Sequence, residues 1–208
     1  GSAGTVYFFR AFNVNASSSV PLDTGAAYPS LSTEGGLLTF SISGVATSTA
    51  TEGVTTNVAT NPNGVSFGTL PIGSSVTAAQ RFTITTNAGE GYRIFAYERQ
   101  DLLGSGGGQI PDITGTNSTP VGWTSGCAIG VSGCYGYHSG EDVLQGGSTR
   151  FAANDTYAAF TGTPSEIAYS VGPVNNKSTD IVLRVEARVT QQAGTYSSDI
   201  VYIVTPVF

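Results

Sequence analysis

The chain has 208 residues, of which only 11% are charged, and glycine alone accounts for 28 of them. Its net charge of −6 and its single lysine argue against a nucleic-acid-binding protein, because contacts to phosphates require clusters of Lys and Arg. No apolar run approaches the roughly 20 residues of a membrane-spanning helix, so we expect no membrane span. Strand and turn formers are abundant and helix formers scarce, which predicts an all-β protein with one large domain.

Residues 5–14 form a strongly β-prone, aromatic segment that opens the sequence. A strand this apolar must join a sheet, and the long polar stretch that follows allows that sheet to belong to the same chain or to a neighbouring copy. The segment is therefore either an ordinary first strand of a sandwich or a donor strand for β-strand addition in a fibre. One face of it, interrupted by Arg10, carries the residues that we expect to act as the donor: Val6, Phe8, Phe12 and Val14.

Apolar and β-prone patterns, most of them alternating, predict further strands at 38–43, 81–85, 92–97, 167–171 and 181–189. Residues 196–204 predict another strand, whose middle is apolar on both faces and is therefore expected to be covered on both sides. Turn-forming residues separate 81–85 from 92–97 and 181–189 from 196–204, so we expect two β-hairpins there. About eight to ten strands in total predict an antiparallel, jelly-roll-like β-sandwich with an N-terminal extension strand. We expect residues 1–36 to form the extension and its linker, and residues 37–208 the sandwich domain.

Residues 103–150 form a long glycine-rich excursion that contains both cysteines of the chain. Cys127 and Cys134 enclose only six residues, and this spacing predicts a disulfide that pins a loop in an oxidising compartment. The sequence contains no methionine, so we expect either that a secretory signal was cleaved before Gly1 or that Gly1 and Ser2 are a cloning remnant. We expect a secreted protein located outside the cell or on its surface.

Two stretches resemble exported bacterial β-sandwich proteins. Residues 65–73 read V-x-F-G-x-L-x-x-G, and residues 193–206 resemble the closing hairpin of the same broad group. That group includes surface adhesins and pilus subunits, and it is similar to the camelysin/TasA-type subunits of biofilm fibres. The resemblance covers about a third of the chain and implies a secreted surface sandwich; the camelysin/TasA-type subunits polymerise by lending an N-terminal strand. It assigns no functional residue.

Motifs that could carry catalysis or bind a metal are incomplete. Asp23 lies in a D-T-G triplet, but aspartic-protease chemistry needs two such aspartates and no second copy is present. His138, the only histidine, lacks a nucleophile motif elsewhere in the chain. The acidic residues that we considered for calcium lack the spacing of a calcium-binding loop, and solvated acidic loops are the simpler explanation: Asp112, Glu141, Asp142 and Asp155. We expect no enzyme, no cofactor and no bound metal.

The sequence leaves two functions open. The first is a structural subunit of an extracellular filament or pilus, a homopolymer in which residues 5–14 pair with a neighbouring copy. The alternative is a monomeric adhesin or carbohydrate-binding domain, in which aromatic residues of the excursion stack on surface glycans unless they fill the core: Trp123, Tyr135 and Tyr137. Four triplets match the acceptor pattern for N-glycosylation: Asn15, Asn117, Asn154 and Asn176.

Overall fold

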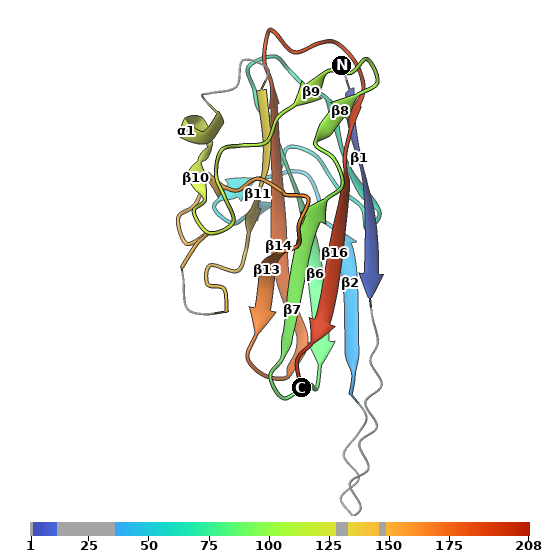
Figure 1. The fold of residues 1–208 in the computed structure, drawn as a ribbon, viewed down its shortest axis with the longest axis vertical. Coiled ribbons are helices and arrows are strands. Elements are labelled where there is room, and N and C mark those ends of the chain that lie inside the picture. Colours follow the sequence, from blue (N-terminus) through green and yellow to red (C-terminus); the bar gives the residue numbers. More distant parts are fainter. Residues whose placement is uncertain (1, 12–35, 128–132, 146–148) are drawn as a thin grey trace, which may run out of the picture.

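The computed structural model describes residues 2–11, 36–127, 133–145 and 149–208, which form an all-β fold with one short helix (Figure 1). Ten strands in these ranges have three or more residues, within the predicted number. They are β1 (Ser2–Ala11), β2 (Leu38–Gly44), β5 (Gly64–Thr69), β6 (Ser75–Thr86), β7 (Tyr92–Glu98), β8 (Leu102–Gly104), β11 (Gly133–Ser139), β13 (Ser165–Ser170), β14 (Val174–Ala187) and β16 (Asp199–Pro206). The short elements are β3 (Ala50–Thr51), β4 (Val54–Thr55), β9 (Gln109–Ile110), β10 (Val121–Gly122), α1 (Trp123–Cys127), β12 (Thr156–Tyr157) and β15 (Tyr196–Ser197).

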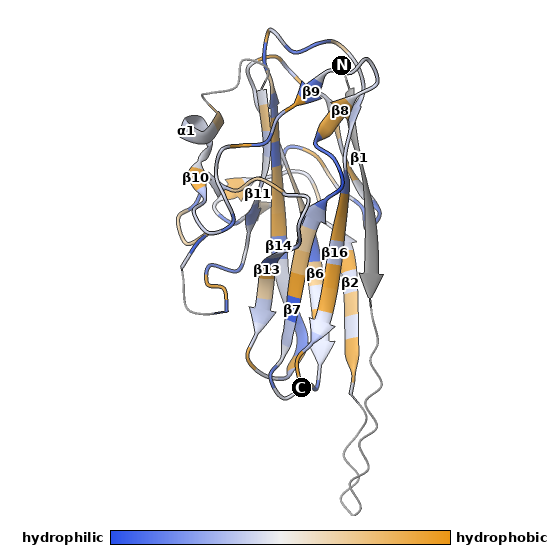
Figure 2. Ribbon diagram, viewed as in Figure 1, coloured by the Kyte–Doolittle hydropathy of each residue, from blue (hydrophilic) through white to orange (hydrophobic). Residues whose placement is uncertain are grey.

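Two large sheets contribute to one core. The first has the strand order β11-β14-β6-β2 and is antiparallel throughout. The second has the order β13-β7-β16-β1-β15-β8-β9, and β5 also pairs with β1. Buried side chains of both sheets meet in a single cluster, and hydrophobic residues dominate β16 and the second half of β14 (Figure 2). Phe82 of β6 contacts both Phe40 of β2 and Tyr202 of β16, at ring-centroid distances of 5.4 and 4.8 Å. The prediction of an all-β, largely antiparallel fold is confirmed.

Both predicted hairpins are wrong, although their strands are correct. β6 pairs with β2 and β14, whereas β7 pairs with β13 and β16, so residues 87–91 carry the chain from one sheet to the other. Gly91 has a φ of +79°, and a Cβ at this position would lie 2.3 Å from the Ser170 carbonyl oxygen. Likewise β14 and β16 belong to different sheets. Turn-forming residues can join two strands of one sheet or two strands of different sheets. They therefore did not predict that the chain passes from one sheet to the other.

The glycine-rich excursion contains a core strand that the sequence pattern missed. All seven residues of β11 are buried, and this strand forms an edge of the four-stranded sheet beside β14. Because both of its faces are covered, it shows no alternation of polar and apolar residues. In the part of the chain that is described, no helix has the length and apolar character needed to cross a membrane.

Candidate functional site

The candidate site is the slot that β1 occupies in the larger sheet. β1 runs parallel to β16, from Val6 opposite Asp199 to Ala11 opposite Val204. On its other side it is antiparallel to β5, and near its start Ala3 lies opposite Tyr196 of β15. β1 is therefore inserted between β5 and β16 of its own chain, and Figure 1 shows it beside β16.

The walls of this slot belong to the main core. β5 contributes Val65 and Phe67, and β16 contributes Ile200, Tyr202 and Val204, all of them buried. Among the described strands, β5 pairs with β1 alone, so β1 connects β5 to the rest of the sheet. An empty slot would leave two unpaired strand edges over exposed core residues, which is an aggregation-prone arrangement. The fold therefore requires a strand in this position.

The connector from β1 to β2 is much longer than the gap between its ends. Residues 12–35 comprise 24 residues, which can span up to about 80 Å when extended. Ala11 lies opposite Val204, and four residues further along the chain Phe208 packs on Gly36, where an added Cβ would lie 2.5 Å from the ring. Those four residues span at most about 14 Å. Most connections in compact domains have about 4–6 residues, so this tether is several times longer than an intramolecular link needs.

The register shows which predicted donor residues lie in β1. Val6 and Phe8 lie opposite Asp199 and Val201, while Phe12 and Val14 lie outside the described residues. The buried core residues Ile200 and Tyr202 have Tyr7 and Phe9 as their register partners. The sequence pattern did not single out Tyr7 or Phe9, because an all-apolar strand does not reveal its register against a sheet.

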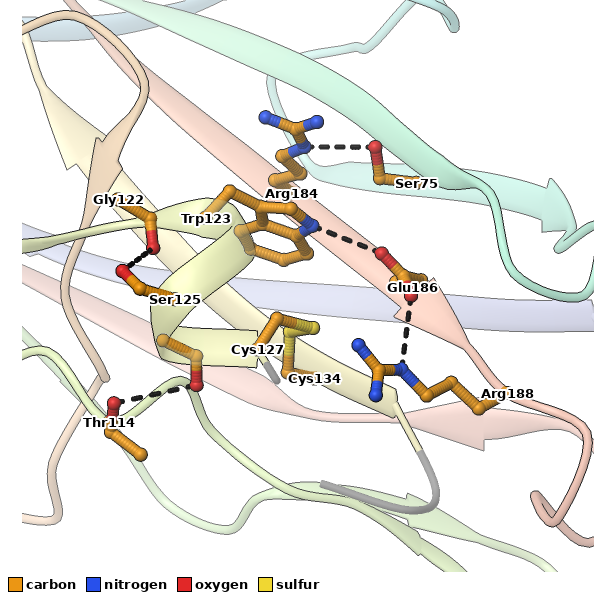
Figure 3. Close-up of a disulfide and its surroundings, with 11 residues drawn as sticks. Ser75, Thr114, Gly122, Trp123, Ser125, Cys127, Cys134, Arg184, Glu186 and Arg188 are labelled. Atoms are coloured by element: carbon orange, nitrogen blue, oxygen red, sulfur yellow. Dashed lines mark hydrogen bonds and ion pairs between the residues drawn. A yellow bond between two sulfur atoms is a disulfide. The ribbon is translucent and has the colours of Figure 1, made fainter. Parts of the chain in front are cut away.

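The predicted disulfide is present and joins α1 to β11, the edge strand of the four-stranded sheet (Figure 3). Cys127 at the end of α1 is bonded to Cys134 of β11, with their Cα atoms 5.5 Å apart. Beside it the Trp123 indole Nε1–H donates a hydrogen bond to Glu186 Oε2 over 3.1 Å, and the Arg184 guanidinium lies 4.8 Å from the indole ring. Trp123 thus packs in a second core cluster with both cysteines.

The aromatic residues considered for sugar stacking are buried. Trp123, Tyr135 and Tyr137 are all 4% exposed or less and belong to the two core clusters. The Tyr137 hydroxyl donates a hydrogen bond to Asn117 Oδ1 over 2.8 Å. These three side chains therefore fill the core and do not form a platform for a sugar ring.

The glycosylation triplets lie in different environments. The Asn117 amide is engaged on both sides, because its Nδ2 also donates to the Glu166 carbonyl over 3.0 Å. Asn154 and Asn176 are exposed, whereas Asn15 lies outside the described residues. The exposed pair could accept a glycan without disturbing the core.

The titratable residues singled out in the sequence do not gather into one site. His138 is buried, and its Nδ1 lies 2.7 Å from the Thr156 carbonyl oxygen. Glu141 pairs with Lys177 over 2.8 Å, and Asp155 pairs with Arg184. Asp23 lies outside the described residues.

Asp112 faces two acids that the sequence analysis missed, Glu98 and Asp101, whose carboxylate oxygens lie within 4.8 Å of one another and of Asp112. Burial raises the pKa of Glu98 to about 7. Burial and the neighbouring Glu98 charge raise that of Asp112 to about 10. These residues lie at the end of β7 and just after β9, so their proximity depends on a loop path that no spacing pattern encodes.

A scan of protein-family models and a search of curated proteins return no match to this chain.

Proposed function

We propose that this chain is a structural subunit of an extracellular filament, and that β1 of one copy fills the slot between β5 and β16 of the next. The observation that supports this most strongly is the combination of an indispensable strand and an overlong tether. β1 joins β5 to the sheet, yet 24 residues separate it from the rest of its own chain. The backbone pairings that hold β1 in its own chain are equally available to β1 of another copy.

Strand donation of this kind would generate a polymer. Each subunit offers one donor strand and one slot, so the contact is heterologous and repeats without closing when the rotation between subunits is open. Each slot would bury the same core residues that the intramolecular strand covers now, with backbone hydrogen bonds worth roughly 0.5–1.5 kcal/mol each. Exchange between the self-filled and the donated arrangement is therefore close to neutral in contacts, and the tether length decides which arrangement is reached at high concentration.

An extracellular location agrees with the chemistry of the chain. The Cys127–Cys134 disulfide is stable in an oxidising compartment, which suggests export. Copies of the same chain are the partners in this proposal. A carbohydrate-binding or adhesin function is the weaker alternative, because the aromatic residues that would stack on sugars are in the core.

The proposal can be tested by locking β1 to its own chain. Phe8 and Val201 are register partners, and neighbouring strands lie about 4.8 Å apart, within the Cα separation that a disulfide spans. The variant Phe8→Cys/Val201→Cys, oxidised at low concentration as a monomer and then concentrated, is expected to form no filaments by electron microscopy. Filaments from fully locked chains would refute strand donation.

A matched control places an equivalent pair of cysteines on two neighbouring strands away from the slot. Ser41 and Thr83 are register partners in β2 and β6, and neither strand contacts β1 by pairing. The variant Ser41→Cys/Thr83→Cys should assemble like the wild type. Reduction should release the Phe8→Cys/Val201→Cys variant, and the control shows how far reduction of the native disulfide affects assembly.

A further inference from the structure

The exposed apolar side chains gather at the two ends of the elongated molecule. Among the described residues seven large hydrophobic side chains are exposed, and six of them belong to segments that Figure 1 places at the two ends, as judged from the strands that they adjoin. We call the end with the C-terminus in Figure 1 the lower pole and the end with the N-terminus the upper pole. The lower pole carries Leu37, Val171 and Phe208, which are 45%, 77% and 58% exposed. The upper pole carries Ile72, Leu103 and Val189, which are 60%, 43% and 83% exposed.

The lower pole is a continuous surface built from several segments. The Val207 N–H donates to the Gly91 carbonyl over 2.9 Å, and Phe208 packs on Gly36 beside Leu37. Gly91 in turn lies against Ser170, the residue before Val171. Apolar side chains therefore protrude at this end from three segments: the β13–β14 turn, the residue before β2 and the last residues after β16.

The upper pole contains a pocket of complementary chemistry. It has a volume of about 110 Å³ and a mostly apolar lining: Leu70, Ile72, Ile110, Ala187, Gln191, Gln192, Ala193 and Tyr196. The Gly73 N–H donates to the Ala187 carbonyl over 2.8 Å, which holds the β5–β6 connection against the end of β14. Tyr196 lines the pocket and is also the register partner of Ala3, so the pocket adjoins the start of the slot.

We propose that the upper pole of one copy binds the lower pole of the next, with the apolar side chains of the lower pole seated at the pocket beside Ile72. This inference rests on the proposed filament function and adds a second junction to it. An apolar surface at one end that binds an apolar pocket at the other makes a head-to-tail contact, and its repetition gives an open stack. Exposed apolar patches of this kind mark protein interaction sites.

The two junctions are geometrically compatible. β1 ends at the lower pole, where Ala11 lies opposite Val204, and β2 also starts there. In a stack, the connector of a donor must therefore run the length of one body. β14 has 14 residues and spans about 46 Å, whereas 24 residues reach about 80 Å. The tether is therefore long enough for a stacked donor.

Sedimentation velocity on the locked Phe8→Cys/Val201→Cys chain tests the pole contact without strand exchange. The locked chain is expected to form short oligomers whose size rises with concentration. Ile72→Asp at the upper pole and Val171→Asp at the lower pole should each weaken this association by about tenfold or more. A mixture of the two variants should recover dimers only, because the mixture retains one intact junction. Val143→Asp, at an exposed residue of neither pole, is the control and should associate like its parent.

The outcomes separate this inference from the proposed function. A locked chain that stays monomeric would overturn the pole contact and leave strand donation standing. If Ile72→Asp is monomeric but Val171→Asp associates normally, the upper poles bind each other and the head-to-tail contact is wrong. If the locked chain associates at the poles but the unlocked chain never exchanges strands, the pole contact stands and strand donation fails.

Discussion

Tyr202 of β16 packs edge-on against Phe82 of β6, with ring centroids 4.8 Å apart, and the same Tyr202 is the register partner of Phe9 in β1. One residue thus connects the core between the sheets with the slot that the first strand fills. The stability of the core and the occupancy of the slot should therefore change together.

Phe82→Ala should destabilise the fold by about 3–5 kcal/mol, because it removes a buried ring that contacts Phe40 and Tyr202. Chemical denaturation followed by tryptophan fluorescence measures this loss. Val171→Ala, at a position that is 77% exposed, is the matched control and should change the free energy of unfolding by less than about 0.5 kcal/mol. Equal effects of the two substitutions would contradict the placement of Phe82 in the core.

Cys127→Ala/Cys134→Ala should lower the free energy of unfolding by about 2 kcal/mol, because the short loop is no longer closed in the unfolded chain. The wild type in a reducing buffer should lose a similar amount. The double variant should not respond to the reductant at all, since the chain has no other cysteine. A response of the double variant would mean that the reductant acts elsewhere.

The carboxyl cluster predicts that stability falls as the pH rises. The folded state raises the pKa of Glu98 to about 7 and of Asp112 to about 10, whereas both carboxyl groups titrate near 4 in an unfolded chain. A group whose pKa is raised in the folded state contributes fully to the free energy of unfolding below about pH 4. This contribution is lost as the pH rises through 7 and towards 10. The melting temperature of Asp112→Asn should therefore rise relative to that of the wild type as the pH increases from 5 to 9. Glu90→Gln, which removes an exposed acid outside the cluster, is the control for the loss of one carboxyl group.

The register of β1 predicts which residues matter for filling the slot. Tyr7 and Phe9 lie opposite the buried Ile200 and Tyr202, so Tyr7→Asp/Phe9→Asp should prevent a stable fold or a filament. Val6→Asp/Phe8→Asp should be tolerated better, because Asp199 is only half-buried and Val201, although buried, lies outside the main core cluster. Circular dichroism and electron microscopy compare the two variants. If the second pair is the more damaging, the donor face predicted from the sequence is correct and the strand occupies the slot in a different register.

The sequence predicted individual strands well and their pairing poorly. β2, β6, β7, β14 and β16 have one polar face or an unmistakable apolar run, and such patterns depend only on the strand itself. Their pairing depends on whether a turn such as residues 87–91 keeps the chain in one sheet or moves it to the other, and turn residues fit both paths. β11 was missed because a strand buried on both faces between glycines has no alternation.

The candidate site was predicted in its strand but not in its partners. The aromatic, β-prone segment after Gly4 predicted a strand that must join a sheet. The polar stretch that follows it in the sequence predicted a long tether. That β5 and β16 form the two walls follows only from tertiary packing, since these strands are more than 100 residues apart in the chain. The burial of Trp123, Tyr135 and Tyr137 likewise depends on which sheet the excursion covers.

The most direct test of strand donation uses two chain populations that each carry half of a cross-link. Unlabelled chains with Phe8→Cys and isotope-labelled chains with Val201→Cys are unfolded, mixed, refolded at high concentration and oxidised, and the linked peptides are identified by mass spectrometry. Our account predicts a disulfide between position 8 of one chain and position 201 of the other, formed in parallel with filaments. Filaments that contain no such inter-chain link would show that β1 stays in its own chain and that strand donation is not how the subunits assemble.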